Sequence, residues 1–486
     1  MSEKIEELRQ VRIQKLQQLK DLGIDPFPVK SERTHTIAQS LESFDDLSAK
    51  EQPLILAGRI RSIRTHGKIA FANIEDGSGS IQIMLKDEKL GEDLFKQFTD
   101  FFDIGDFMEV TGVLIISKTG EKTLLASRYS LLTKSIRPIP QQYFGIKDLE
   151  TRLRKRYLDL VANKDARDLF VKKSLFWKTM REFLESRGFL EVNLNVLEPV
   201  PGGAEAEPFV THHNALGRDF FLRISLELPL KKLLVGGYEK VFEIGRIFRN
   251  EGISTEHLQD YMQMEFYWAY AEYEALMDMC EDMYKQIVQN VTGSLKTVYD
   301  GNEIDWSGKW PKVRYFDVFK EKTGMDLNTV SDDELKTYAK AEHIKLEDNL
   351  GRGRVIDLIY KKKIRPSLIQ PCFLINPPVE IEPLAKKDPT NPKEVQRMQI
   401  MAGGTELGKG FSELNDPIDQ MERFEAQMKL REQGDKEAQM LDEDFVEALE
   451  YGMPPAAGFG LSERLFAVIL DKSIRETQFF PPMKEE

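Results

Sequence analysis

Residues 53 to about 135 alternate apolar and polar side chains, and this pattern constrains the fold more than any other part of the chain. Side chains alternate between the two faces of a strand, so the pattern predicts strands with one buried face. Turns are expected at the glycine-containing stretches 65–67, 76–79 and 118–120, and an acidic helical stretch precedes the last two strands. A few strands with one helix suit a small Greek-key barrel of the OB type, whose central strands commonly bind single-stranded nucleic acid.

Two residues of this expected barrel are candidates for contact with a nucleic-acid base. Phe71 lies on the second expected strand and Gln82 on the third. A ring can stack on a base, and an amide can hydrogen-bond to the edge of a base. A phenylalanine on a strand is also commonly buried in the core, and a glutamine commonly lies on the surface. The pattern alone leaves both interpretations open.

The chain on either side of the barrel is predicted to be helical or irregular. Residues 3 to about 22 have apolar side chains at helical spacing and a basic side, which predicts an amphipathic helix. The proline-punctuated stretch "IRPIPQQYFGIKD" is a connector, and a second basic run, "TRLRKRYLDL", follows it. Both basic stretches are interpreted as solvated helix faces. The remaining chain alternates helices and strands in one long α/β region.

Composition excludes several classes of protein. Hydrophobic residues make up 41% and charged residues 31% of the 486 residues, which excludes a disordered chain, and no apolar run is long enough to span a bilayer. The net charge of −13 argues against a protein that coats nucleic acid indiscriminately. The N-terminal residues lack the apolar core of a signal peptide, and the distant Cys280 and Cys372 form neither a disulfide framework nor a zinc site. A reducing cytoplasm is the expected compartment.

A predicted hairpin gathers the most reactive set of side chains. In "VFEIGRIFRNEGISTEH", Arg249 and Glu251 are expected to share one face of a strand, and a second strand carries Glu265 and Tyr267 on one face. Arginine binds phosphate or carboxylate bidentately and neutralises developing charge. A cross-strand ion pair with core aromatics explains any one of these residues, but not the cluster. The other members of the cluster are His257 and Tyr261.

A second charged stretch, "GGTELGKGFSELND", places Glu406, Lys409 and Glu413 close together in the sequence. In a regular strand Lys409 and Glu413 would share a face and Glu406 would point away. Gly408 and Gly410 can interrupt that alternation, because glycines inside a strand often mark a bulge. A bulge would bring all three charges to one site, whereas an exposed turn with solvated charges is the alternative.

Four phrases carry a resemblance to a known family: "RKRYLDL", "THHNAL", "RNEGIS" and "FSELNDP". With "PGGAEAEPFV" and "EFYWAYAEY", they make the chain resemble the class II aminoacyl-tRNA synthetases, and within that class the lysyl-tRNA synthetase family. The resemblance extends over nearly the whole chain. It implies an α+β protein with an N-terminal OB-fold barrel and a catalytic domain built on an antiparallel sheet flanked by helices. The implied segments are a basic helix over 1–30, an anticodon-binding OB domain over 31–140, a linker over 141–160 and the catalytic domain over 161–486.

The resemblance implies roles for the reactive residues. Arg249 would contact the α-phosphate of ATP and the carboxylate of the amino acid, while Glu251 and His257 would help to hold ATP. Adenine would lie between Tyr261 and Arg464. Negative charge accumulates when a carboxylate attacks the α-phosphorus, so fixed cations are the groups that the reaction needs. The implied catalytic residues are Arg249, Glu251 and Arg464, and Glu406 completes the ATP-binding set.

The resemblance also implies a pocket for L-lysine. An ammonium group calls for carboxylates, and holding both ammonium groups of lysine calls for more than one. An aspartate pocket would instead need a cation where Glu413 lies, so the charges discriminate between the two substrates. The implied lysine-binding residues are Gly203, Glu227, Arg249, Glu265, Tyr267, Lys409 and Glu413.

Two positions near the end of the sheet depart from the family pattern. Glu406 matches the carboxylate that holds magnesium on the ATP phosphates, but Gln399 stands where the second metal-binding glutamate is usual. Lys409 stands where the pocket asparagine is usual. Each change makes the site more positive by one charge. We hypothesise that Lys409 replaces part of the metal charge, near the ATP phosphates or the lysine carboxylate, so that fewer magnesium ions than usual bind tightly.

Other departures concern the motifs that surround the site. Asn195 stands where motif 1 usually has a proline, and the homodimer that the family implies is still expected. Glu207 replaces a basic residue, and motif 3 is one residue shorter, with Ser462 and Glu463 before Arg464. In the barrel, the resemblance assigns anticodon reading to Phe71, Gln82 and Glu121, which favours the base-stacking interpretation of Phe71.

The implied activity is ATP-dependent attachment of L-lysine to tRNA(Lys) through a lysyl-adenylate, within cytoplasmic protein biosynthesis. The expected partners are tRNA(Lys), ATP, L-lysine, Mg²⁺ and a second copy of the chain, with no membrane. One alternative is a paralogue that lysylates a protein, but such paralogues typically lack the anticodon-binding module. Another is a non-catalytic RNA-binding relative. Retention of Arg249, Glu251 and Arg464 argues against the second alternative.

Overall fold

The chain divides into two compact units. The structure, a computed structural model, describes residues 3–139, 148–252, 258–346, 350–433 and 438–484. One unit comprises Met1–Arg152 with Tyr157–Ala162, and the other comprises Leu153–Arg156 with Asn163–Glu486. Residues 140–147, at the start of the expected linker, lie outside the described residues. The two units are called the barrel unit and the catalytic-sheet unit below.

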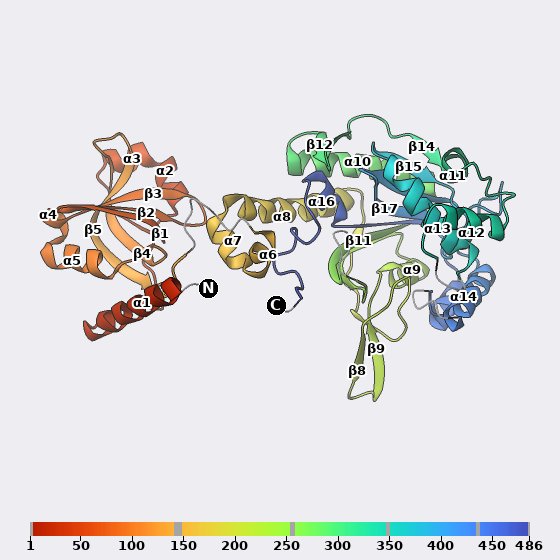
Figure 1. Cartoon of the computed structure of the whole chain (residues 1–486), viewed down its shortest axis with the longest axis horizontal. Coiled ribbons are helices and arrows are strands. Elements are labelled where there is room, and N and C mark those ends of the chain that lie inside the picture. The colour runs from red at the N-terminus through yellow and green to blue at the C-terminus, as the bar shows by residue number, and fades with distance from the viewer. Residues whose placement is uncertain (1–2, 140–147, 253–257, 347–349, 434–437, 485–486) are drawn as a thin grey trace. The chain divides into compact units, whose positions relative to one another are not determined.

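The barrel unit is built on a closed five-stranded barrel, as the alternating pattern predicts (Figure 1). The strand order is β1-β2-β3-β5-β4, and every neighbouring pair is antiparallel except β3 and β5. Alternate residues of each strand fill the core, among them Leu56, Ile74 and Ile83, because one face of each strand lies inside the barrel. The elements are α2 (Ile37–Glu42), α3 (Phe44–Ala49), β1 (Leu54–His66), β2 (Ile69–Glu75), β3 (Ser80–Lys86), α4 (Asp87–Leu90), α5 (Glu92–Phe101), β4 (Phe107–Ile116) and β5 (Lys122–Thr133).

Helix α1 (Glu3–Asp21) packs on the barrel partly through its basic side. The guanidinium of Arg12 is buried and donates to the carbonyls of Ser135 and Ile104, at 3.1 and 3.0 Å. Lys15 pairs with Asp103 at 2.9 Å. The interpretation of this side as solvated is therefore wrong for Arg12, whereas Lys4 and Lys20 are exposed.

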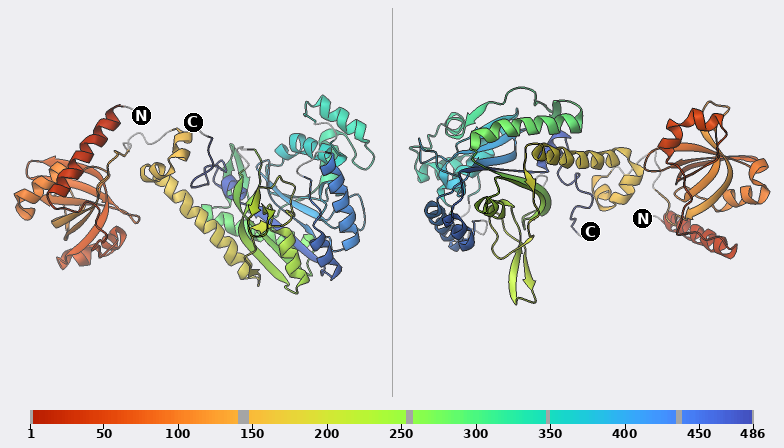
Figure 2. Two further views of the ribbon diagram at one scale, coloured as in Figure 1. Left: turned by 90° about the horizontal axis from the view of Figure 1, so that it is seen from below. Right: turned by 180° about the vertical axis from the view of Figure 1, so that it is seen from behind.

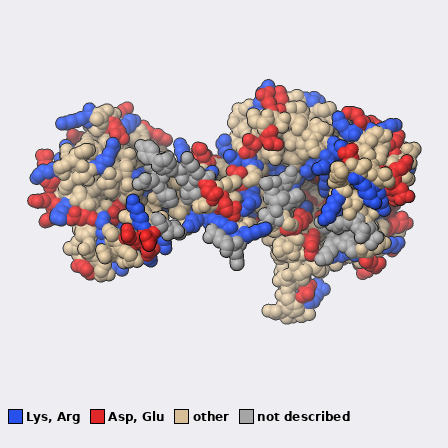
Figure 3. Space-filling view, in the orientation of Figure 1, with Lys and Arg blue, Asp and Glu red and all other residues tan. Residues whose placement is uncertain are grey.

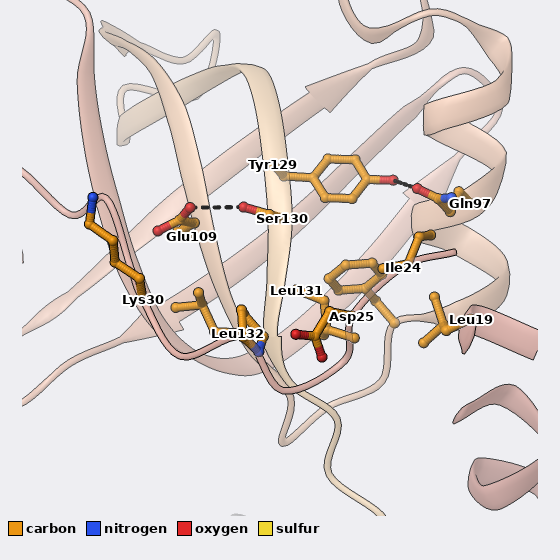
Figure 4. A pocket seen from close by; sticks show the side chains of 12 residues that line it. Leu19, Ile24, Asp25, Lys30, Gln97, Glu109, Tyr129, Ser130, Leu131 and Leu132 are labelled. Atoms are coloured by element: carbon orange, nitrogen blue, oxygen red, sulfur yellow. Dashed lines mark hydrogen bonds between the residues drawn. The ribbon is translucent and has the colours of Figure 1, made fainter. Parts of the chain in front are cut away.

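A cavity of about 310 Å³ lies beside the end of α1 in the same unit (Figure 4). Leu19, Ile24 and Leu131 line its apolar side. On its polar side Ser130 donates a hydrogen bond to Glu109 at 2.9 Å. The helix end and strand β5 thus share a partly apolar contact that keeps α1 on the barrel.

The catalytic-sheet unit contains an eight-stranded sheet within the described residues. The order is β14-β15-β16-β17-β18-β11-β10-β6, and only the two outer pairs, β14 with β15 and β10 with β6, run parallel. The central pairs are antiparallel, which agrees with the antiparallel sheet expected from the resemblance. The strands are β6 (Leu190–Glu191), β10 (Lys240–Phe248), β11 (Asp260–Ala269), β14 (Lys312–Arg314), β15 (Cys372–Ile375), β16 (Arg397–Ala402), β17 (Thr405–Ser412) and β18 (Ala456–Ser462).

The two faces of this sheet are covered differently (Figures 1 and 2). Helices α8 (Lys164–Glu185) and α10 (Tyr273–Thr292) pack together on the core face, where Phe242, Phe266 and Phe459 join one large hydrophobic cluster. The opposite face, called the pocket face, carries the even-numbered glycines Gly458 and Gly460 of β18. It is bordered on one side by α9 (Glu227–Val235), α14 (Pro417–Glu432) and α15 (Glu443–Glu450), and on the other by α11 (Tyr315–Thr323), α12 (Asp332–Ala341) and α13 (Arg352–Lys363).

Smaller elements complete the unit. β8 and β9 form a hairpin that projects from the large sheet (Figure 1). Arg156 is buried and donates to the carbonyls of Glu476 and Gln478, so the interpretation of the second basic run as a solvated face is wrong at this residue. The elements of this unit not yet given are β7 (Leu197–Glu198), β8 (Val210–His213), β9 (Arg218–Leu222), β12 (Lys296–Tyr299), β13 (Asn302–Asp305), the 3₁₀ turns Arg365–Ser367 and Val379–Ile381, and α16 (Arg464–Ile469). Helices α6 (Leu149–Arg154) and α7 (Arg156–Ala162) each contribute residues to both units.

Neither the barrel unit nor the catalytic-sheet unit contains, in its described part, a helix long and apolar enough to cross a membrane. The two cysteines, Cys280 in α10 and Cys372 in β15, are buried free thiols.

Candidate active site

Strand β17 contains the bulge that its glycines predict. The pairing with β16 runs Gln399 opposite Lys409 and Ile400 opposite Gly408, and then shifts so that Met401 lies opposite Glu406. The extra residue, Leu407, points into the core cluster under the sheet. Because one residue is skipped, Glu406 and Lys409 come to the same face. Of the two alternatives that the sequence leaves open, the structure shows the bulge and not the exposed turn.

Glycines form the floor of the pocket face. In β18, Gly460 lies between Lys409 of β17 and Glu265 of β11, and Gly458 occupies the same position one row further along. A Cβ atom at Gly458 would lie 2.3 Å from Glu413 Oε1 and 2.3 Å from the Tyr267 ring. The lack of side chains in the middle strand therefore leaves space between the charged residues of the two neighbouring strands.

Glu265 faces this space from β11 and is fully hydrogen-bonded. Its Oε1 accepts from Ser225 Oγ at 2.7 Å, from Leu226 N at 3.0 Å and from Gln263 Nε2 at 2.6 Å. Its Oε2 accepts from Tyr267 OH at 3.1 Å. Four neutral donors stabilise a carboxylate without cancelling its charge. Glu265 and Tyr267 share a face, as the sequence predicts.

Glu227 and Glu413 reach the same space from other segments, and both are buried. Glu227 begins helix α9, and Gly203, with φ of 82°, lies so close that a Cβ there would be 2.8 Å from that of Glu227. Lys231 bridges the two carboxylates, with Nζ 2.6 Å from Glu227 Oε1 and in an ion pair with Glu413 Oε2. Burial raises the pKa of Glu227 to about 7 and that of Glu413 well above its ordinary value, and Lys231 opposes both rises.

The Arg249 end of the site lies beside the carboxylates. Arg249 Cζ is 5.8 Å from the centre of the Tyr261 ring, and its Nε donates to the carbonyl of Ile224 at 3.3 Å. Burial raises the pKa of Tyr261, while the charges of Arg249 and Arg464 oppose the rise, so both arginines lie near this ring. The structure thus gathers three residues expected at ATP.

The expected strand geometry is wrong at one point. β10 ends at Phe248, so Arg249 and Glu251 do not lie on one strand. Arg249 N still donates to the carbonyl of Gln259, but Asn250 N donates to the carbonyl of Glu207 instead of continuing the hairpin. Glu251 therefore lies in the following loop. His257 lies outside the described residues.

The shortened motif 3 places Arg464 at a direct junction between β18 and α16. Glu463 alone connects the strand to the helix, and its carboxylate is buried. Gln478 Nε2 donates to its Oε1 at 2.6 Å, and Lys173 forms an ion pair with its Oε2. Arg464 itself donates to the carbonyl of Glu406 at 3.3 Å. These contacts hold Arg464 at the end of the pocket face.

The candidate metal position contains one carboxylate. Gln399 Nε2 donates to Glu406 Oε2 at 2.7 Å, while the buried Gln399 Oε1 has no hydrogen-bond partner in the described part of the chain. No cluster of three or more His, Cys, Asp or Glu side chains suited to a metal occurs among the described residues. One carboxylate and one amide oxygen fit a magnesium ion whose other ligands are phosphate oxygens and water.

Lys409 belongs to a charge cluster that the sequence does not indicate. Its Nζ lies 3.1 Å from Glu382 Oε2, and Arg397 Nη1 lies 3.0 Å from the same oxygen. Burial would raise the pKa of Glu382, but Lys409 and Arg397 outweigh it and lower the pKa. The trio carries one net positive charge. Glu205, ion-paired with Arg354 at 3.0 Å, lies close enough to Lys409 to interact with it electrostatically.

The expected anticodon residues lie together in the barrel unit. Phe71 is half-buried on the outer face, since its neighbours Ala70 and Ala72 fill the core. Gln82 lies one strand away on the same side of the sheet, and its Nε2 donates to Glu121 Oε2 at 2.6 Å. The interpretation of Gln82 as a surface residue is wrong, because its side chain is buried. The interpretation of Phe71 as a core residue is wrong.

Comparison with protein families agrees with this geometry. Residues 148–484 match the model of the class II tRNA synthetases (D, K and N). The chain belongs to this family. Residues 54–132 of the synthetase match the OB-fold nucleic acid binding domain, which covers the observed barrel.

Similar proteins match the synthetase from end to end. A lysine–tRNA ligase of Staphylococcus saprophyticus is 44% identical, with 100% of each chain covered. A lysine–tRNA ligase of Carboxydothermus hydrogenoformans is 44% identical, with 99% of each chain covered. A lysine–tRNA ligase of Bacillus subtilis is 42% identical over 99% of this chain and 98% of its own.

Two residues of the synthetase's site are missing from the sequence-based prediction. Lys231 has a usable signal, because it follows Glu227 by one helical turn and i,i+4 pairs of opposite charge face each other on a helix. Glu382 has none. It lies in an irregular segment after a 3₁₀ turn, and only the tertiary fold brings it to Lys409.

Proposed function

We propose that this synthetase attaches L-lysine to tRNA(Lys) in two steps. The observation that carries the proposal is the set of three buried carboxylates, Glu227, Glu265 and Glu413, around a floor of glycines. Burying three carboxylates in one pocket is costly unless cations balance them. L-lysine brings two ammonium groups, and relatives of 42–44% identity are named lysine–tRNA ligases.

In the first step the lysine carboxylate attacks the α-phosphorus of ATP. A new phosphorus–oxygen bond forms, the bond to the bridging oxygen breaks, and pyrophosphate leaves lysyl-adenylate behind. No general base is needed, because the attacking carboxylate is already ionised. We assign Arg249 to the carboxylate and α-phosphate, Glu251, His257, Tyr261 and Arg464 to ATP, and Gly203, Glu227, Glu265, Tyr267, Lys409 and Glu413 to lysine. The protein acts by positioning the reactants and neutralising charge.

In the second step a ribose hydroxyl at the end of the tRNA attacks the carbonyl of the adenylate, and AMP leaves. We assign residues 31–140 to anticodon binding, with Phe71 stacking on a base and Gln82 and Glu121 reading its edge. The helix at 1–30, the linker at 141–160 and the catalytic domain at 161–486 complete the proposed division of the chain. The position of Gln82 on the same side of the sheet as Phe71, and its hydrogen bond to Glu121, support this assignment.

We assign magnesium to Glu406, where it would neutralise the ATP phosphates. Because Gln399 is neutral and Lys409 is close to Glu406, we propose that the site holds fewer ions than one with two carboxylates. A crystal structure with ATP tests this. We expect one protein-bound ion with Lys409 directed toward the substrates. Several ions on protein side chains, with Lys409 turned to solvent, would contradict it.

We propose that the synthetase is a homodimer that acts in the cytoplasm. Exposed apolar side chains occur before and within the projecting hairpin, among them Leu190, Leu197, Val210 and Leu216, and a partner would cover such side chains. Asn195 lies in the same region. The buried free thiols of Cys280 and Cys372 are consistent with a reducing compartment. Sedimentation analysis would show the dimer.

Lysine-dependent exchange of pyrophosphate into ATP, followed by transfer of lysine to tRNA(Lys), tests the proposed activity. We expect both reactions. Exchange without transfer to tRNA but with transfer to a protein would indicate the paralogue alternative, and absence of both would indicate a non-catalytic relative. Exchange with a different amino acid would overturn the choice of substrate.

A further inference from the structure

Lys231 is a positive charge enclosed by the protein at the back of the pocket. Its side chain has no exposed surface, and its ammonium lies between Glu227 and Glu413. The rings of Phe411, Phe445 and Tyr267 surround it, with centroids 5.2, 5.9 and 6.0 Å from Nζ. Because carboxylates and ring faces hold it on several sides, this ammonium is a fixed part of the pocket.

The position of Lys231 determines the charge of its two partners. Burial would lower the pKa of Lys231, but Glu227 and Glu413 outweigh it and raise the pKa. Burial raises the pKa of both carboxyl groups, the charge of Glu265 adds to the rise for Glu227, and the charge of Glu227 adds to the rise for Glu413. Lys231 is the first charge that opposes the rise for either group. Lys231 therefore favours the ionised form of both carboxyl groups.

The pocket charges match L-lysine when Lys231 is counted. When all three carboxylates are ionised, they and the Lys231 ammonium leave two negative charges, and L-lysine supplies two ammonium groups. Both oxygens of Glu265 accept hydrogen bonds from neutral donors. Glu413 Oε1 is different, because it is buried and has no hydrogen-bond partner in the described residues, while Oε2 faces Lys231. One oxygen of Glu413 is thus held by the protein and the other is open to the glycine-floored space.

We propose that Lys231 is a positioning residue that gives the synthetase its preference for a charged side-chain terminus. It holds one oxygen of Glu413, opposes protonation of that carboxylate and leaves Oε1 for the terminal ammonium of the substrate. This inference rests on the proposed function. The inference goes beyond the proposed function by assigning selectivity to a residue that the bound amino acid does not need to contact.

Several groups face Glu413 and enter any pH dependence. Lys231 and Glu227 face it from α9, and Tyr267 faces it from β11. Glu382 also influences it electrostatically. Burial raises the pKa of Tyr267 well above its ordinary value, so its hydroxyl stays neutral in the range of interest. Lys409 and Arg397 outweigh burial and lower the pKa of Glu382, so its charge does not change near neutral pH.

The test compares L-lysine with 6-hydroxy-L-norleucine, in which a neutral hydroxyl replaces the terminal ammonium. Dissociation constants for both are measured by calorimetry between about pH 6 and about pH 9 for the wild type, Lys231→Met and Lys232→Met. Lys232 is the matched control, because it is the next residue of α9 but pairs with Asp444 at the surface. For Lys231→Met we expect the preference for lysine to fall about 100-fold at neutral pH and to recover at high pH, as Glu413 ionises. Lys232→Met should keep the wild-type preference.

A purely structural role for Lys231 would weaken both ligands equally and leave the preference and its pH profile unchanged, and that result would overturn the inference. Lys231→Gln is measured as well, since its amide can still donate to both carboxylates if methionine impairs folding. It should show the same loss of preference, and Lys231→Arg, which keeps the charge, should restore it. A wild type that binds no lysine would instead refute the proposed function.

Discussion

The barrel unit and the catalytic-sheet unit each gather candidate functional side chains on one face of a mostly antiparallel sheet, but they do so in different ways. Phe71 in the barrel is half-buried on an outer face, with Gln82 and Glu121 bonded to each other. On the catalytic sheet, Glu265 and Glu413 are almost completely buried. On the side shown in Figure 3, Lys and Arg are interspersed with Asp and Glu over each unit.

The difference indicates in which unit the loss of one side chain should reduce selectivity most. A surface that binds nucleic acid uses stacking and a few hydrogen bonds that water can replace, so each residue contributes a moderate amount of binding free energy. In a pocket of buried carboxylates water cannot replace a lost partner, because a carboxylate or ammonium left without its partner remains desolvated. Substitutions on the catalytic sheet should therefore affect the chemical step strongly, and those on the barrel should affect only the step with tRNA.

The largest effect is expected for Glu265→Gln. The change removes one negative charge but leaves Ser225 and Tyr267 as donors with a poorer acceptor. We expect lysine-dependent exchange to fall about 1000-fold, as for loss of one partner of a buried charge pair. Glu274→Gln, on the exposed first turn of α10, should leave exchange unchanged. A small effect of Glu265→Gln would contradict the expectation that substitutions on the catalytic sheet affect the chemical step strongly.

A pair of glycine substitutions sharpens the role of the pocket floor. Gly458→Ala places a methyl group 2.3 Å from Glu413 and from the Tyr267 ring, so both must move. We expect kcat/KM for lysine to fall about 100-fold. Gly460→Ala is the matched control, since its nearest neighbour, Glu265 Cγ, is 3.2 Å away. Equal effects at the two positions would show that the floor does not shape the pocket.

On the barrel, Phe71→Ala should act on tRNA alone. Loss of a stacking ring should lower kcat/KM for tRNA(Lys) by about 30-fold. Exchange of pyrophosphate, which needs no tRNA, is measured on the same preparation and should be unchanged. A parallel loss of exchange would mean that Phe71 supports folding rather than base binding.

The smallest effect is the dependence of lysine affinity on pH. Burial raises the pKa of Glu227 to about 7, so at pH 6 this carboxyl is mostly protonated and at pH 8 it is mostly ionised. An ammonium favours the ionised form, so binding at the lower pH must release a proton. We expect affinity to fall about tenfold from pH 8 to pH 6. Calorimetry in buffers of different ionisation enthalpy measures the proton released, and Glu227→Gln should flatten the profile if it still binds lysine.

Much of the site follows from local sequence patterns. The alternation of β11 places Glu265 and Tyr267 on one face, and the glycines of β17 predict the bulge that turns Glu406 to the side of Lys409. The prediction that Arg249 and Glu251 lie on one strand is wrong. The strand ends before Arg249, and the backbone NH of Asn250 donates to the carbonyl of Glu207, a residue far away in the sequence. Glu382 was missed for the same reason.

The sequence by itself determined the family, the barrel and which strands carry the reactive residues, since these depend on periodicity and on motifs read within one segment. Only the tertiary structure decided how the charges are balanced. Lys231 lies between carboxylates from α9 and from the end of β17, and Lys409 lies beside Glu382, with each partner supplied by a distant segment. A buried charge is stable only when an opposite charge and hydrogen-bonding groups lie beside it. Packing, rather than position along the chain, determines which residues those partners are.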